Sequence, residues 1–110
     1  MNLRIEKTEG FKITDELPEG VSVTHKGRLA DGRLFVLLEK GGYHTTQVFV
    51  GSHDSKVLEL KEVEVIGTER MRDGGTTIIK TKEGIFYFPS PLNKGKFSEP
   101  TFGGEKIEIF

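Results

Sequence analysis

Three histidines, His25, His44 and His53, are the side chains of this sequence best suited to catalysis or metal binding. Metal motifs place ligands on alternate residues of a strand or on successive turns of a helix. These histidines are far apart in the chain, so only the fold could bring them together, and we predict no metal site. Alternation places His25 on the same face as Val21 and Val23, which indicates a core or edge histidine with satisfied hydrogen bonds.

The segment Ser52-His53-Asp54 contains the three residue types of a hydrolase triad. A triad needs the histidine between the serine and the carboxylate in space, which adjacent residues rarely achieve. We interpret the segment as a polar turn, and Glu59, Glu62 and Glu64 as solvated charges rather than an acid–base pair. We therefore predict no catalytic residue and no cofactor. We rank an enzyme last of the three functions considered. It would be a hydrolase or a metal-dependent protein built from the histidines.

Glycine-containing loops beside basic residues are the next candidates, at 41–44, 70–77 and 94–96. Backbone amides together with lysine or arginine can cradle a phosphate group. None of these loops has the spacing of a nucleotide-binding motif, and ordinary turns need glycine as well. In this alternative reading the ligand-binding residues are Tyr43, His44, Arg70, Arg72, Lys80, Lys82, Lys94 and Lys96.

An apolar excess near residue 86 suggests a contact surface. Phe86 and Phe88 alternate with Ile85 and Tyr87. If the segment is a strand, one of these pairs faces outward unless both faces are covered. An outward apolar pair is a reason to expect a partner protein or an oligomer interface.

Composition and charge limit the classes of protein. Sixteen basic and 17 acidic residues give a formal net charge of -1, which argues against the strongly basic surface typical of nucleic-acid-binding domains. The absence of cysteine excludes a disulfide framework and thiolate chemistry, and it fits a cytoplasmic protein. Residues 1–6 lack the apolar core of a signal peptide, and no apolar run approaches the roughly 20 residues of a membrane span. We expect a cytoplasmic protein without a membrane partner.

Residue preferences predict an all-β fold. Valine, isoleucine and threonine are abundant, whereas alanine occurs once, at Ala30. Branched and aromatic side chains suit a pleated sheet, and a helical protein would contain more alanine. The 14 glycines and 4 prolines provide many turn positions. We predict a single domain over 1–110, a small antiparallel barrel, roll or sandwich of about eight short strands, mostly connected as hairpins.

The predicted strands are alternating or continuously apolar segments between turn residues. They cover 2–7, 21–29, 33–39, 45–50, 56–66, 76–81, 85–88 and 106–110, and 11–13 is a short apolar alternation. The run 33–39 is apolar at consecutive positions, which predicts a strand buried on both faces. Segment 68–72 is polar, and 93–104 is interpreted as a loop. Strands at both chain ends suggest that they pair with each other or with a second copy.

Two turns predict hairpins. Asp31-Gly32 suits the tight turn whose two central residues take positive φ, so the flanking strands pair. Lys82-Glu83-Gly84 joins the next pair, with Gly84 in the left-handed position of a three-residue loop. Pro89 and Pro91 end the second strand of that pair.

The segment 56–66 has two interpretations. Leu58 and Leu60 share one parity and Val63 and Val65 the other, so an uninterrupted strand would leave one pair in water. A β-bulge near Lys61-Glu62 would bring both pairs to one side, and a short helix is the alternative. The apolar positions form no clean helical stripe, which favours the bulged strand.

These observations favour a small non-catalytic binding or interaction module. Its partner would be another protein or a second copy, giving a homo-oligomer of low order. The alternative is a binder of a nucleotide, another phosphorylated small ligand or single-stranded nucleic acid. Convergence of the basic residues on one cleft would distinguish the two readings.

Overall fold

Extended segments that reverse at short turns make up the whole described chain. The computed structural model describes residues 2–6, 10–41, 45–51, 59–72, 75–90 and 99–110. The described residues form twelve strands and no helix, so the predicted all-β class is confirmed. Among them there is no helix long and apolar enough to cross a membrane.

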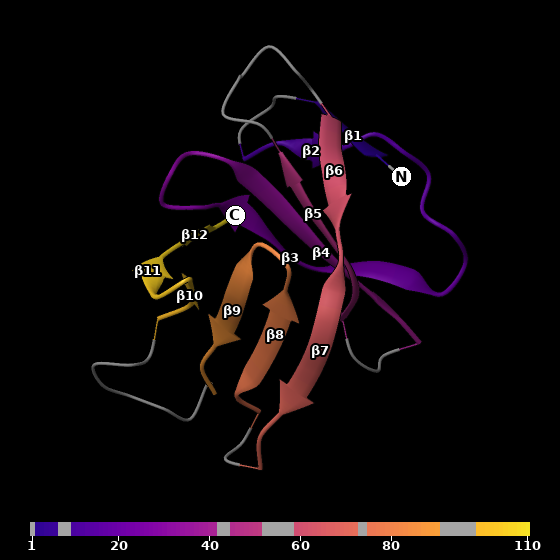
Figure 1. Ribbon diagram of the computed structural model, residues 1–110. Coiled ribbons are helices and arrows are strands. Elements are labelled where there is room, and N and C mark those ends of the chain that lie inside the picture. The colour runs from indigo at the N-terminus through magenta and orange to yellow at the C-terminus, as the bar shows by residue number, and fades with distance from the viewer. Residues whose placement is uncertain (1, 7–9, 42–44, 52–58, 73–74, 91–98) are drawn as a thin grey trace.

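Seven strands form one antiparallel sheet, which curls into a half-barrel (Figure 1). Their order across the sheet is β12 (Glu108–Ile109), β3 (Val21–Arg28), β4 (Leu34–Lys40), β5 (Thr45–Gly51), β6 (Glu59–Val63), β1 (Asn2–Glu6) and β2 (Lys12–Ile13). Neighbours from β3 to β6 are consecutive in the chain, so the predicted hairpin connections are confirmed there.

The other five strands form a second antiparallel sheet. Their order is β11 (Glu105–Lys106), β10 (Thr101–Phe102), β9 (Gly84–Phe88), β8 (Thr77–Thr81) and β7 (Val65–Arg70). The chain passes from the first sheet to the second where β6 continues into β7 at Glu64 (Figure 1). The described residues form twelve strands instead of the expected eight. The short alternation at 11–13 contributes β2, the predicted strand at 56–66 divides, and the end of the chain forms three two-residue strands instead of one.

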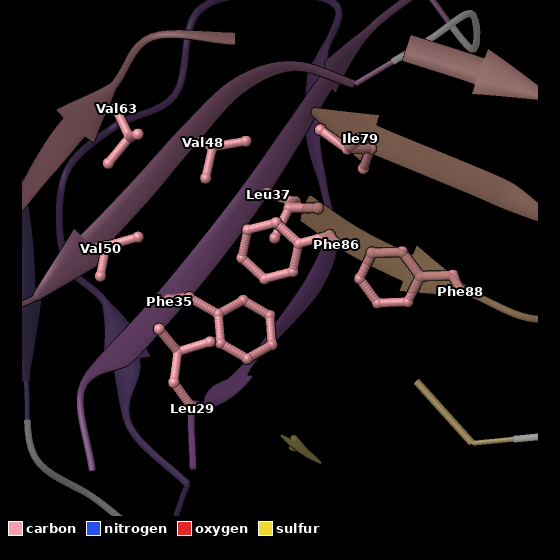
Figure 2. Packing of buried hydrophobic residues seen from close by; sticks show 9 residues of the cluster. All are labelled: Leu29, Phe35, Leu37, Val48, Val50, Val63, Ile79, Phe86 and Phe88. Carbon is pink, nitrogen blue, oxygen red and sulfur yellow. The ribbon is translucent and has the colours of Figure 1, made fainter. Parts of the chain in front are cut away.

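A first core lies between the two sheets (Figure 2). Strands β4 and β5 contribute Phe35, Leu37, Val48 and Val50, and the second sheet places Ile79, Phe86 and Phe88 against them. Leu29 and Val63 complete the buried cluster. Each such side chain stabilises the fold by about 1.5–3 kcal/mol when it leaves water.

A second core lies on the opposite face of the seven-stranded sheet. It contains Leu3, Ile5, Phe11, Val36, Leu38, Phe49 and Leu60. All but Phe11, which directly precedes β2, come from strands of one sheet, and they meet because its curl turns β1 and β2 toward β4. Strand β4 is therefore covered on one face by the second sheet and on the other by its own sheet. This confirms the predicted strand buried on both faces, in which Phe35 to Leu38 are all buried.

A bulge in β3 corrects the predicted position of His25. Val23 pairs with Leu38 and His25 with Leu37, so the register shifts between Val23 and His25. Paired residues of an antiparallel sheet share a face. Because Leu37 and Leu38 belong to different cores, His25 lies on the opposite face from Val23. Simple alternation across this bulge gave the wrong face.

Both predicted hairpins form, with different turns from those expected. Around Asp31, the Leu29 N–H donates to Arg33 O at 2.7 Å, and of the intervening residues only Gly32 has positive φ, at 94°. The loop thus has three residues with one left-handed position. In the other hairpin Thr81 pairs with Gly84, so the loop has two residues rather than three.

The segment 56–66 was predicted as one bulged strand, and that prediction is wrong beyond residue 63. Residues 56–58 lie outside the described residues, and the chain forms β6 and then β7. Leu60 and Val63 face opposite sides, and both are buried because both faces of the first sheet are covered. No bulge at Lys61-Glu62 is needed to shield them.

The polar segment 68–72, for which no strand was predicted, lies partly in β7, which extends to Arg70. Thr101–Phe102 forms β10 inside the predicted loop 93–104, of which residues 93–98 lie outside the described residues. The two terminal strands do not pair with each other. Strand β1 pairs with β6 and β2, and β12 pairs with β3 at the far end of the same sheet.

Candidate functional site

The second sheet presents one face to the core and one outward. Cross-strand pairs Glu69–Ile78, Lys80–Ile85 and Ile78–Tyr87 lie on the outward side. We call these five residues, together with Ile66 at the bulge in β7, the outer face: Ile66, Glu69, Ile78, Lys80, Ile85 and Tyr87. Ile66 is 65% exposed and Ile85 is 47% exposed.

Alternation along β9 determines what this face contains. Phe86 and Phe88 point into the first core, where they are 0% and 7% exposed. Ile85 and Tyr87 therefore point outward, as expected if only one side of the strand is covered. Antiparallel sheets usually place polar residues on an uncovered face. Aliphatic and aromatic side chains on this one make it a candidate contact surface.

The outer face also carries charges of both signs. Lys80 is exposed on β8, and Glu69 is exposed on β7 next to Ile78. At one end of the same strands, Lys82 Nζ lies 2.9 Å from Glu64 Oε2. Lys82 is thus neutralised locally, whereas Lys80 has no ion pair among the described salt bridges.

The structure separates the basic residues of the alternative reading. Arg70 pairs with Thr77 at one end of the β7–β8 ladder, and Lys82 follows Thr81 at the other. Lys80 lies on the outer face, and Arg72 follows β7. Four further residues of that prediction, Tyr43, His44, Lys94 and Lys96, lie outside the described residues. Neither of the two cavities described below includes any of the four described basic residues in its lining, and the interpretation stays a prediction.

His25 is the one candidate histidine within the described residues. Its ring stacks on Phe88 with centroids 4.1 Å apart and an interplanar angle of 18°. Its Nδ1 is buried and has no hydrogen-bond partner among the described residues, so the expectation of satisfied hydrogen bonds is wrong. Burial lowers the pKa of His25 from its usual 6.5, and the charge of Glu39 opposes this shift.

Metal and triad chemistry find no support in the described residues. They contain no group of three or more histidine, cysteine, aspartate or glutamate side chains arranged to hold a metal. His44, His53 and the segment Ser52-His53-Asp54 lie outside the described residues. The predicted solvent exposure of Glu62 and Glu64 is confirmed, and Glu59 is half-buried.

A second candidate site lies in the opening between the two ends of the curled sheet. A cavity of about 480 Å³, called the seam cavity here, is lined by Gly10, Lys26, Arg28, Glu108 and Phe110. Ligand sites commonly have volumes of roughly 300–1,000 Å³. Strand β3 supplies both cations, and the end of the chain supplies the carboxylate and the aromatic ring.

Contacts hold the walls of the seam cavity in place. The Phe110 N–H donates to Lys26 O at 2.9 Å, which fixes the last residue against β3. The Phe110 ring packs edge-on against Phe11 at 5.8 Å and lies 5.2 Å from the Arg28 guanidinium carbon. Lys26 Nζ donates to Phe11 O at 2.9 Å. The two ends of the sheet are thus bridged by side chains, without a strand ladder.

Sequence reasoning missed this cavity because its walls are distant in the chain. The available signal was Lys26 and Arg28 at alternate positions of an expected strand, which places both on one face. Nothing local indicated that the terminal Phe110 would lie beside them.

A smaller cavity of about 230 Å³ lies near the first hairpin turn and includes Arg33 and Phe102 in its lining. Arg33 Nε is 2.8 Å from Asp31 Oδ2, and its Nη1 is 3.0 Å from Glu83 Oε2. Two carboxylates therefore neutralise this cation.

Comparison with protein-family models, curated proteins and solved structures finds no match to this chain. The structure defines a class, an all-β protein of two antiparallel sheets, one of them a half-barrel. The outer face and the seam cavity are its two candidate functional sites.

Proposed function

We propose that the protein is a small non-catalytic binding module that acts through protein–protein contacts at its outer face. The observation behind this proposal is the exposure of Ile66 and Ile85 beside Tyr87 on an uncovered sheet. Apolar side chains grouped on an exposed surface mark interaction sites more often than isolated ones do. Contact with a partner would remove this area from water and stabilise the complex.

A second copy of the chain suits this surface as the partner. In a two-fold arrangement each copy presents the same patch, so Lys80 of one copy can face Glu69 of the other. The aliphatic side chains would then pack between the charged ones. The expected assembly is a homo-oligomer of low order. A cytoplasmic location remains a prediction, based on the absence of cysteine.

Sedimentation velocity at tens of micromolar protein tests the proposal. We expect the wild type to sediment as a low-order oligomer and Ile85→Asp to sediment as a monomer, because a buried unpaired carboxylate opposes association. Val23→Asp is the matched control, since Val23 is 37% exposed on the other sheet. It should leave the oligomer unchanged.

Two outcomes would count against the proposal. A wild type that is strictly monomeric at these concentrations would remove self-association. If the Ile85→Asp variant sedimented as the same oligomer as the wild type, the outer face would not be the surface through which the copies associate. Circular dichroism of both variants checks that they retain the fold.

A further inference from the structure

We infer that the seam cavity binds a small molecule carrying one anionic group, a carboxylate or a phosphate monoester, on a flat apolar body. This inference does not depend on the proposed function, because the cavity lies on the first sheet and the outer face on the second. It rests on the cavity's cations, its aromatic wall and the backbone beside it.

The two cations have donors left for an anion. Lys26 and Arg28 lie on one face of β3, and both line the cavity. Lys26 is half-buried, and its ammonium uses one donor on Phe11 O. The Arg28 guanidinium has five N–H groups, and its described polar contact is the 3.4 Å contact of Nη1 with Glu108 Oε2. That contact is long and exposed, so an incoming anion can replace it.

Among the lining side chains, the two cations of Lys26 and Arg28 exceed the Glu108 carboxylate by one charge, which suits a ligand with a single anionic group. The carboxylate of Glu108 competes with the ligand for Arg28. The Phe110 ring forms part of the wall, next to the guanidinium. A flat apolar body on the ligand would pack on this ring while its anionic group reaches Lys26 and Arg28.

The backbone at Phe11, next to the cavity residue Gly10, has an unusual conformation. Phe11 has φ of 52°, whereas the φ of 73° at Gly10 is ordinary for a glycine. For a bulky residue such as phenylalanine a positive φ is an outlier, and such strain tends to occur at ligand sites. The carbonyl of this same residue accepts from Lys26 Nζ at 2.9 Å, which holds the ammonium at the cavity wall. The unusual backbone and a binding group therefore lie together.

Titration of the full chain followed by backbone amide NMR tests this inference. The probes are benzoate, phenyl phosphate, inorganic phosphate and the neutral benzyl alcohol, each up to about 10 mM, so that binding as weak as the millimolar range is detected. We expect benzoate or phenyl phosphate to shift the amides of Gly10, Lys26, Arg28 and Phe110. The two probes distinguish a carboxylate ligand from a phosphate one.

Charge variants show whether the cavity is responsible. Lys26→Gln and Arg28→Gln should each weaken binding about tenfold, because each removes charge-assisted hydrogen bonds. Arg28 is exposed enough for its variant to fold. Glu108→Gln should tighten binding, which a purely structural role of Glu108 would not produce. Lys61→Gln on β6 is the matched control, because Lys61 is exposed and belongs neither to the cavity lining nor to the outer face, and it should leave the affinity unchanged.

Four results would overturn the inference. One is the absence of shifts with both aromatic anions. Another is binding of benzyl alcohol as tight as that of the aromatic anions, which would show that no anionic group is required. Equally tight binding of inorganic phosphate would show that no apolar body is required, and it counts with the same result. The others are an affinity unchanged by Arg28→Gln, and loss of binding in Lys61→Gln, which would place the site away from the seam cavity.

Discussion

His25 shows how burial changes the behaviour of one residue. Its ring stacks on Phe88 and its Nδ1 lacks a partner among the described residues. A charged imidazolium there would lose hydration without gaining a hydrogen bond, so the folded state favours the neutral ring and the pKa falls. The unfolded chain then binds the proton more tightly than the folded one. Stability due to the neutral ring is present above the unfolded pKa of 6.5 and decreases as the pH falls below it.

We expect acid to destabilise the wild type more than the His25→Phe variant. Urea unfolding at about pH 7.5 and about pH 5 measures this, because both proteins share every other titrating group. Between about pH 7.5 and about pH 5, the free energy of unfolding of the wild type should fall by more than that of the variant. If the free energies of unfolding of the two proteins changed equally with pH, His25 would be protonated as readily in the folded state as in the unfolded chain.

At the scale of the element, Gly27 allows β12 to pair with β3. A Cβ at this position would overlap the carbonyl oxygen of Glu108 and come within 3.0 Å of the Phe35 ring. Glycine is thus needed for the close approach of two backbones. This close approach also holds Phe110 at the seam cavity.

Gly27→Ala should therefore destabilise the protein by about 1–3 kcal/mol through overpacking. It should also reduce the protection of the Phe110 amide from hydrogen exchange, since that amide bonds to Lys26 O. Gly67→Ala on β7 is the matched control, because a Cβ there meets nothing within 4 Å. Its effect should stay within about 0.5 kcal/mol. Equal effects of the two changes would contradict the proposed role of Gly27.

Local patterns predicted most elements, and their failures have physical causes. Alternation identified β1, and the apolar run identified β4 as buried on both faces. The bulge in β3 was not predicted because it depends on how β3 pairs with β4. Nothing in the sequence from Val21 to His25 indicates it. The division between β6 and β7 arises because the chain leaves the first sheet after β6 and enters the second sheet with β7. The seam cavity depends on curl, a property that no single strand encodes.

At the scale of the whole molecule, β4 belongs to both cores. Leu37 contacts the first and Leu38 the second, and both are almost fully buried. Neither core can lose β4 without exposing the other. The described sheets should therefore unfold together in one transition.

Leu37→Ala and Leu38→Ala should each destabilise the protein by about 2–5 kcal/mol, as expected for buried leucine truncations. Denaturation followed by far-ultraviolet circular dichroism and by tyrosine fluorescence should give coincident transitions for the wild type and both variants. Val23→Ala, at an exposed position, should change the free energy of unfolding by about 0.5 kcal/mol or less. Separate transitions for the two probes would show that the cores are independent.

The bulge at Val65–Gly67 limits how copies of this molecule can add to one another. Strand β7 is the six-residue edge of the second sheet in the described chain, and long edges invite endless strand-to-strand growth. Here the edge is irregular near Ile66 and carries Glu69 and Arg70, features that oppose continuous fibril-like stacking. In the proposed homo-oligomer, association would therefore use the outer face of the sheet, where two copies would close on each other and leave no free surface of that kind.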